Sequence, residues 1–170
     1  GAVTIELARC YRGLGETLAE RQRHQEAVDA LQQAVELREQ LPHETANRIA
    51  LTHDYYLLSL SYQQLDRMED ALRCARTRLA LWEATAADDP QSQAGRKGRT
   101  FSHADLAHLL VAAGRTEEAT AEYRQAVELI ERLTADFPGD SAYGGVLENL
   151  RQRLAELPKP KEPTPKPSSN

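Results

Sequence analysis

The chain has 170 residues, about the length of one domain, and its 21 Lys and Arg residues against 26 Asp and Glu residues give a net charge of −5. This negative balance argues against nucleic acid as the main partner, because neutralising phosphates requires a cationic face. Mean hydropathy is −0.61, and no apolar run approaches the roughly 18 residues that a membrane-spanning helix needs, so we expect no membrane partner. Residues 1–3 begin no signal peptide, and we expect a cytoplasmic protein.

Apolar residues recur with a helical period along most of the chain, which predicts an all-α fold. Ala27, Leu31, Ala34 and Val35, for example, fall on one helix face. No run combines alternating polarity with the composition of a strand. We predict seven helices, at residues 3–21, 24–40, 44–65, 68–87, 100–113, 116–135 and 141–156.

The boundaries of the later helices depend on glycines. Gly95 and Gly98 would each cost about 1 kcal/mol inside a helix, so we expect residues 91–99 to form a loop or a frayed turn. Gly114 suits the C-terminal cap of one helix, and Thr116 suits the start of the next.

The last 13 residues differ in composition from the rest. Residues 158–170 contain five of the eight prolines, no large apolar residue, and three Lys against one Glu, a net charge of +2. Such a segment cannot bury a core, so we divide the chain into a helical domain, 1–157, and a disordered Pro/Lys-rich tail, 158–170. Pro160 and Pro163 have the PxxP spacing of ligands for proline-recognising domains, and the alternative is a linker.

The two cysteines, Cys10 and Cys74, have neither metal-ligand spacing nor the pattern of a disulfide framework. Because free cysteine is among the most buried residue types, we expect both to be reduced core residues.

An internal repeat organises the helical region. Pro42, Pro90 and Pro138 are spaced 48 residues apart, twice over, which prompts a search for similar copies. A core of Arg-x-x-acid-Ala recurs at residues 23–27, 67–71 and 115–119.

These copies resemble the tetratricopeptide repeat, whose helix pair has a small residue in the first helix and an alanine twelve residues later in the second. The resemblance covers residues 8–138, and residues 141–156 look like a closing half-repeat. It implies a right-handed superhelix of about three antiparallel helix pairs plus a C-terminal closing helix. It also places the small residues where the two helices of a pair come closest, namely Gly15 and Ala27, Ser59 and Ala71, and Ala107 and Ala119.

The sequence departs from the family in two respects. The copies are 44 to 48 residues apart, longer than the usual period of about 34. Elongated repeats with a proline between copies resemble arrays appended to bacterial signalling proteins, including some Ser/Thr kinases. In addition, Arg78 occupies a position where a small packing residue is expected, so either the second copy is looser or Arg78 extends its stem outward.

No pattern in the sequence indicates catalysis. Gly13-Leu-Gly15 lies inside a predicted helix without the preceding strand and third glycine of a phosphate-binding loop. His103 and His108 are five residues apart and fall on different helix faces, unlike a helical zinc motif. We therefore expect a non-enzymatic protein with no catalytic residues, no metal and no cofactor.

The resemblance implies that the first helix of each pair lines a concave groove. The family's groove positions give an apolar and aromatic centre with polar groups around it, which suits a protein partner that presents a peptide or a helix. In the alternative reading, Tyr56 and Phe101 are partly buried against neighbouring helices. The predicted partner-binding residues are Arg12, Glu16, Tyr56, Leu60, Gln63, Phe101, Asp105 and His108.

One branch of the family captures a C-terminal carboxylate with Lys and Asn in the groove. The matching positions here contain one basic residue and two acidic ones, so we expect no such clamp. They are Arg12, Glu16, Leu57, Phe101 and Asp105.

An alternative function is self-association, or a spacer role in a larger multidomain signalling protein. The outer face of the first helix, including Val3 and Ile5, would then stack on another copy and form a homo-oligomer.

Overall fold

The computed structural model describes residues 1–42 and 44–158, so the Pro/Lys-rich tail, apart from Pro158, lies outside the described residues and stays a prediction. The described residues form seven helices and no strand, which confirms the all-α prediction. The helices are α1 (Ala2–Glu20), α2 (His24–Glu39), α3 (Thr45–Gln64), α4 (Met68–Asp88), α5 (Gln93–Ala112), α6 (Thr116–Asp136) and α7 (Ser141–Glu156).

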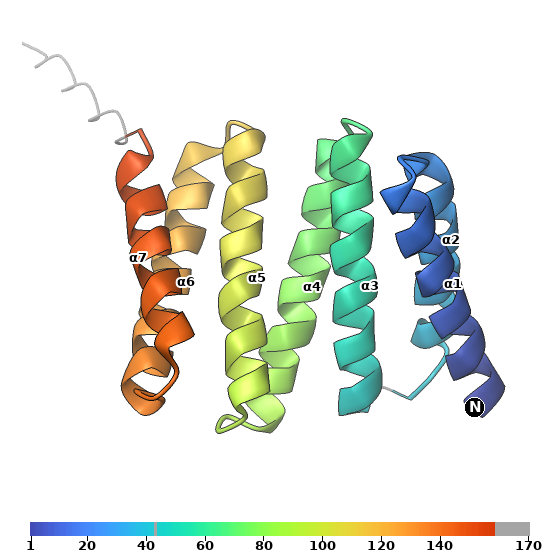
Figure 1. Cartoon of the computed structure of the whole chain (residues 1–170), viewed down its shortest axis with the longest axis horizontal. Helices are drawn as coiled ribbons and strands as arrows, with labels where there is room; N and C mark the ends of the chain where they lie inside the picture. Colours follow the sequence, from blue (N-terminus) through green and yellow to red (C-terminus); the bar gives the residue numbers. More distant parts are fainter. Residues whose placement is uncertain (43, 159–170) are drawn as a thin grey trace, which may run out of the picture.

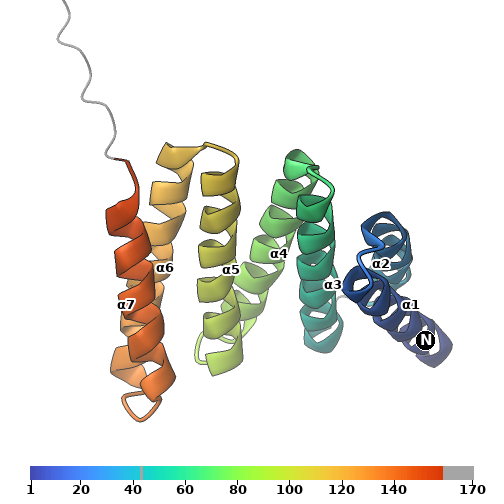
Figure 2. The ribbon, with the colours of Figure 1, turned by 45° about the horizontal axis from the view of Figure 1, so that its top comes forward.

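The helices stand side by side in chain order, with α1 at one end of the row and α7 at the other (Figure 1). α1 packs most extensively on α2, α3 on α4, and α5 on α6, while α7 closes on α6. A view turned by 45° shows the same succession of pairs (Figure 2). The three predicted helix pairs and the closing helix are therefore confirmed.

Small residues allow the helices of each pair to approach closely. A Cβ atom added to Gly15 would lie 2.6 Å from Cγ of Leu31 and 3.3 Å from the carbonyl oxygen of Ala27. At the same position of the next pair, the Ser59 hydroxyl donates a hydrogen bond of 3.0 Å to the Ala71 carbonyl. The positions predicted for close helix approach are confirmed, and larger side chains there would force the pairs apart.

The turn inside each pair has the same backbone conformation at three matching positions. Gln22, Asp66 and Gly114 have φ angles of 61°, 56° and 72°. Only Gly114 adopts this left-handed conformation without steric cost, as the predicted C-terminal cap requires. The repeat therefore fixes the turn even where the residue type does not favour it.

Residues 93–99 are helical, so the predicted loop or frayed turn at 91–99 is wrong for most of its length. Ser92 caps α5, and its side chain accepts a hydrogen bond of 3.2 Å from the backbone N–H of Gly95. A Cβ on Gly95 would meet the Cα of Ala86 at 3.3 Å, and one on Gly98 would overlap the indole ring of Trp82. Both glycines serve close packing of α5 on α4, and this packing outweighs their low helix propensity.

The two cysteines have different environments. Cys74 is buried in the core, and burial raises the pKa of its thiol to about 11. Cys10 is exposed on α1, so its predicted core position is wrong, because no helix of the described chain covers that face. None of the described helices is long and apolar enough to cross a bilayer.

Candidate functional site

A first pocket, of about 190 Å³, lies among α3, α4 and α5. It collects five of the eight predicted binding residues, from two consecutive repeat copies. These are Tyr56, Leu60, Gln63, Asp105 and His108.

Arg78 of α4 also lines this pocket and holds its walls together. Its guanidinium forms an ion pair with Asp105 of α5 and lies 4.7 Å from the ring centroid of Tyr56 of α3. Only 15% of the Arg78 side chain is exposed. The charge in place of a small residue is thus compensated by a carboxylate, and the aliphatic stem runs along an aromatic face. The pairing leaves Asp105 largely neutralised as a partner for an incoming cation.

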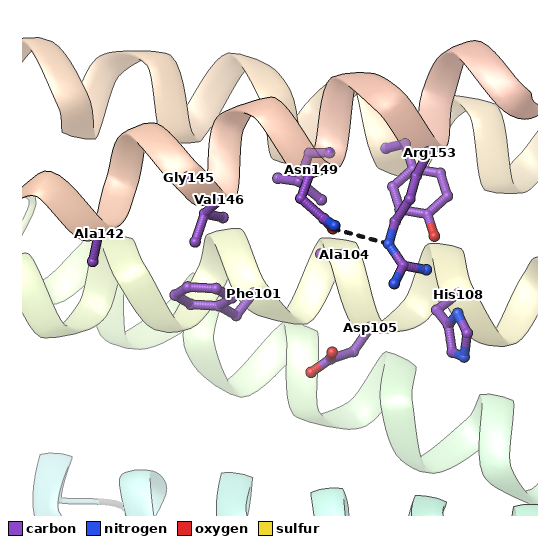
Figure 3. Close-up of a pocket in the computed structure, with 11 residues that line it drawn as sticks. Phe101, Ala104, Asp105, His108, Ala142, Gly145, Val146, Asn149 and Arg153 are labelled. Carbon is purple, nitrogen blue, oxygen red and sulfur yellow. Dashed lines mark hydrogen bonds between the residues drawn. The ribbon is translucent and has the colours of Figure 1, made fainter.

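A second pocket, of about 520 Å³, lies between α5 and α7 (Figure 3). Phe101, Ala104 and Val146 give it an apolar floor. Asn149 and Arg153 of α7 point over this floor, and Nε of Arg153 donates a hydrogen bond of 2.9 Å to the side-chain oxygen of Asn149.

The two pockets adjoin because Asp105 and His108 line both. The aromatic centre predicted as one patch is divided between them, with Tyr56 in the first pocket and Phe101 in the second. Both rings are half-buried, which agrees with the alternative reading in which they pack against neighbouring helices. Together the pockets form a groove that runs across α3, α5 and α7, and we use "groove" for this surface below.

Sequence reasoning missed the contribution of α7. A usable signal was present, since Ala142 falls 48 residues after Ala94, the position that it matches in the third copy. That spacing makes α7 the first helix of a fourth copy, and first helices line the groove. Residues of α7 at the matching positions, such as Val146, Asn149 and Arg153, could therefore have been included.

Arg12 and Glu16 are separate from both pockets. Nη1 of Arg12 lies 3.9 Å from Oδ1 of Asp54, and Nε of Arg12 lies 3.9 Å from a carboxylate oxygen of Glu16. Glu16 also lies 3.9 Å from Nε2 of His53, whose pKa is lowered by burial and by the nearby Arg12 charge. These residues form a polar cluster between α1 and α3, at one end of the array.

The centre of this polar cluster is a buried ion pair that sequence reasoning missed. Nε of Arg38 donates a hydrogen bond of 2.7 Å to Asp54, whose side chain is fully buried. Burial raises the pKa of Asp54 to about 6, against the opposite effect of the Arg38 and Arg12 charges. Asp54 lies between Leu51 and Leu58 on an apolar helix face, and a carboxylate there requires a buried cation. That pattern was the available signal.

The described residues contain no group of three or more His, Cys, Asp or Glu side chains that could hold a metal ion. What the groove offers is an apolar floor with a few directional polar groups, which is the chemistry of a binding surface.

Comparison with known proteins agrees with this architecture. The family model of the tetratricopeptide repeat matches residues 7–41 and 104–138. The chain contains tetratricopeptide repeats. The resemblance drawn from the sequence is therefore confirmed, and the matched segments correspond to the first pair and to most of the third. No curated protein matches the chain.

Two solved tetratricopeptide repeat structures share the fold. The first tetratricopeptide domain of Spaghetti (RPAP3), bound to the HSP90 peptide SRMEEVD, is 16% identical, with a TM-score of 0.52 over 89% of this chain and 95% of that one. The Sgt2 tetratricopeptide domain from Aspergillus fumigatus is 15% identical, with a TM-score of 0.50 over 92% of this chain and 85% of that one. At these identities the likeness establishes the fold alone.

Proposed function

We propose that this chain is a non-catalytic, cytoplasmic scaffold that binds a protein partner through the groove. The observation that carries the proposal is the second pocket, in which Phe101, Ala104 and Val146 form an apolar floor beneath polar groups. A tetratricopeptide domain with the same fold is described with a bound peptide, which supports a peptide as the ligand class.

The charges around the groove favour one kind of peptide. Asp105 is already paired with Arg78, whereas Arg153 of the second pocket forms a hydrogen bond only to the neutral Asn149 among the described residues. The available charge is therefore positive. We propose a segment, extended or helical, that places a large apolar side chain on Phe101 and an acidic side chain beside Arg153.

The test is selection of binders from a random peptide library displayed on phage. Wild-type protein should enrich sequences with an apolar residue near an acidic one. Phe101→Ala should weaken the enriched peptide about 30-fold, the loss of roughly 2 kcal/mol typical of an aromatic hot spot. Arg153→Gln should weaken it less and should remove the preference for acid. Gln125→Ala, at an exposed position on α6 outside both pockets, is the matched control.

Circular dichroism melts should first show that each variant is folded. If Phe101→Ala binds the selected peptides as tightly as Gln125→Ala does, the groove is not the binding site. If no peptide is enriched although the wild type is folded, peptide recognition itself is refuted.

A second candidate function is self-association, or a spacer role within a larger multidomain signalling protein of bacterial type. The observation that favours it is the exposure of apolar side chains on α1, where Val3 is 82% and Ile5 40% exposed. These residues do not belong to either pocket of the groove, so the two functions are compatible.

A further inference from the structure

One face of α1 carries an exposed apolar stripe. Val3, Leu7 and Leu14 are 82%, 45% and 50% exposed, and Cys10 between them is exposed as well. The spacings of four, three and four residues place these side chains in one row along the helix, as in the contact line of a coiled coil. No charged residue interrupts the row, and we refer to these four residues as the outer stripe.

The repeat register shows what the outer stripe is suited to contact. The matching residues of α3 and α5 are mostly buried and face the preceding helix pair. In α3, Asn47 donates to the Arg38 carbonyl and Asp54 pairs with the Arg38 side chain, both on α2. In α5, Gly95 packs on the backbone of Ala86 of α4. The matching sets are Asn47, Leu51, Asp54 and Leu58 in α3, and Gly95, Arg99, Ser102 and Leu106 in α5.

The outer stripe is therefore an inter-pair contact face, and it is more apolar than its two counterparts. Of the seven large apolar side chains that are exposed in the described residues, four belong to α1. The concentration of apolar surface at this end of the row is typical of an interaction site rather than of scattered surface residues.

The opposite end of the row cannot cover the stripe of a second copy. The corresponding face of α7 is already packed on α6, where Tyr143 and Leu150 are buried. The exposed positions of α7 include Glu148, Arg151 and Gln152, which are polar and charged. Head-to-tail stacking would thus bury charges against the outer stripe without partners, at a cost in free energy.

The faces of α2 and α6 that contact the next pair are also occupied within the chain, by α3 and α7. Among the described surfaces, the outer stripe of another copy is the one that matches in length, spacing and polarity. A two-fold axis pairs such a surface with itself and closes the assembly at two subunits.

We propose that two copies of this chain associate through α1, with the outer stripe of each packed against that of the other. The inference does not rest on peptide binding in the groove, which lies on other side chains. A single helix-to-helix contact is small for a stable interface, so the dimer is weak and forms in the micromolar range.

Sedimentation velocity on the full chain, from about 1 µM to about 1 mM, tests the proposal over the range of weak affinities. The wild type should shift from monomer to dimer as its concentration rises. Leu7→Glu combined with Leu14→Glu should remain monomeric, with a dissociation constant raised at least 100-fold. The matched control is Ile49→Glu combined with Val111→Glu, because these residues are 38% and 41% exposed but lie off the stripe. It should dimerise like the wild type.

A second readout uses the thiol within the stripe. Alkylation of Cys10 by a maleimide should slow as protein concentration rises in the wild type and in the control, but not in the Leu7→Glu/Leu14→Glu variant. A folded wild type that stays monomeric at 1 mM would overturn the proposal and leave the stripe to a helix of another polypeptide. A dimer that persists in the folded stripe variant would overturn it too. Peptide binding by the stripe variant reports separately on the groove.

Discussion

Gly98 provides a sharp test of the packing between α4 and α5. Its position in the sequence suggests a helix breaker, but in the structure it lies inside α5 directly against Trp82 of α4. Replacing Gly98 by alanine adds one methyl group, which would overlap the indole ring. Gly13→Ala is the matched control, because Gly13 also lies within a helix and an added Cβ there meets nothing within 4 Å.

The expected magnitudes follow from two opposing effects. Each substitution gains about 1 kcal/mol of helix propensity. Gly98→Ala additionally overpacks the contact with Trp82, at a cost of about 1–3 kcal/mol. Gly13→Ala should therefore stabilise the protein by about 1 kcal/mol, and Gly98→Ala should range from neutral to destabilising by about 2 kcal/mol. For a domain of this size, each kcal/mol corresponds to about 2–4 °C in Tm.

The assay is thermal unfolding followed by fluorescence and by circular dichroism. Trp82 is the only tryptophan in the chain, so its emission reports this one contact. Gly98→Ala should shift the emission and lower Tm relative to Gly13→Ala, and Trp82→Leu in the same background should restore part of the loss. Equal stabilisation by both alanines, with unchanged tryptophan emission, would refute the packing of α5 on α4 and support a loop at residues 91–99.

Two further predictions concern buried groups. The pKa of Asp54 is raised from 3.8 to about 6 by burial, so its contribution to stability is complete below about pH 4 and is lost as pH rises through about 6. Urea denaturation between pH 4 and 7 should give a fall of up to about 3 kcal/mol in the wild type that Asp54→Asn lacks, and equal slopes would contradict it. In the native protein, one thiol, Cys10, should react rapidly with a disulfide reagent while Cys74 reacts only on unfolding; two fast thiols would exclude burial of Cys74.

The fold could be predicted because the repeat states its packing rules locally. Small residues at Gly15 and Ala27, and at their counterparts in the next two copies, mark where helices touch, and apolar periodicity marks which faces are buried. The segment 91–99 could not be predicted in the same way. Glycine is a poor helix former in isolation, and only the position of Trp82 on the neighbouring helix makes its small size necessary.

The candidate site was predictable only in part, for a related reason. Register alone identified Tyr56, Phe101 and His108 as groove residues. It could not show that Arg78 would cross from α4 to Asp105 and divide the aromatic patch, since that contact depends on how two pairs are rotated against each other. Partner-specific contacts of this kind arise between repeats, where the sequence period carries no information.

The departures from the repeat pattern indicate how the junctions between pairs differ. The junction of α2 and α3 is held by a buried Arg38–Asp54 ion pair, whereas that of α4 and α5 has the Gly98–Trp82 contact and the Arg78–Asp105 bridge. In a solenoid, small rotations at each junction set the curvature of the binding surface. Because the junctions differ chemically, the groove is not a regular surface that any register of ligand could occupy. Unequal junctions therefore fix where along the row a peptide can bind, which is how a scaffold without catalytic chemistry selects its partner.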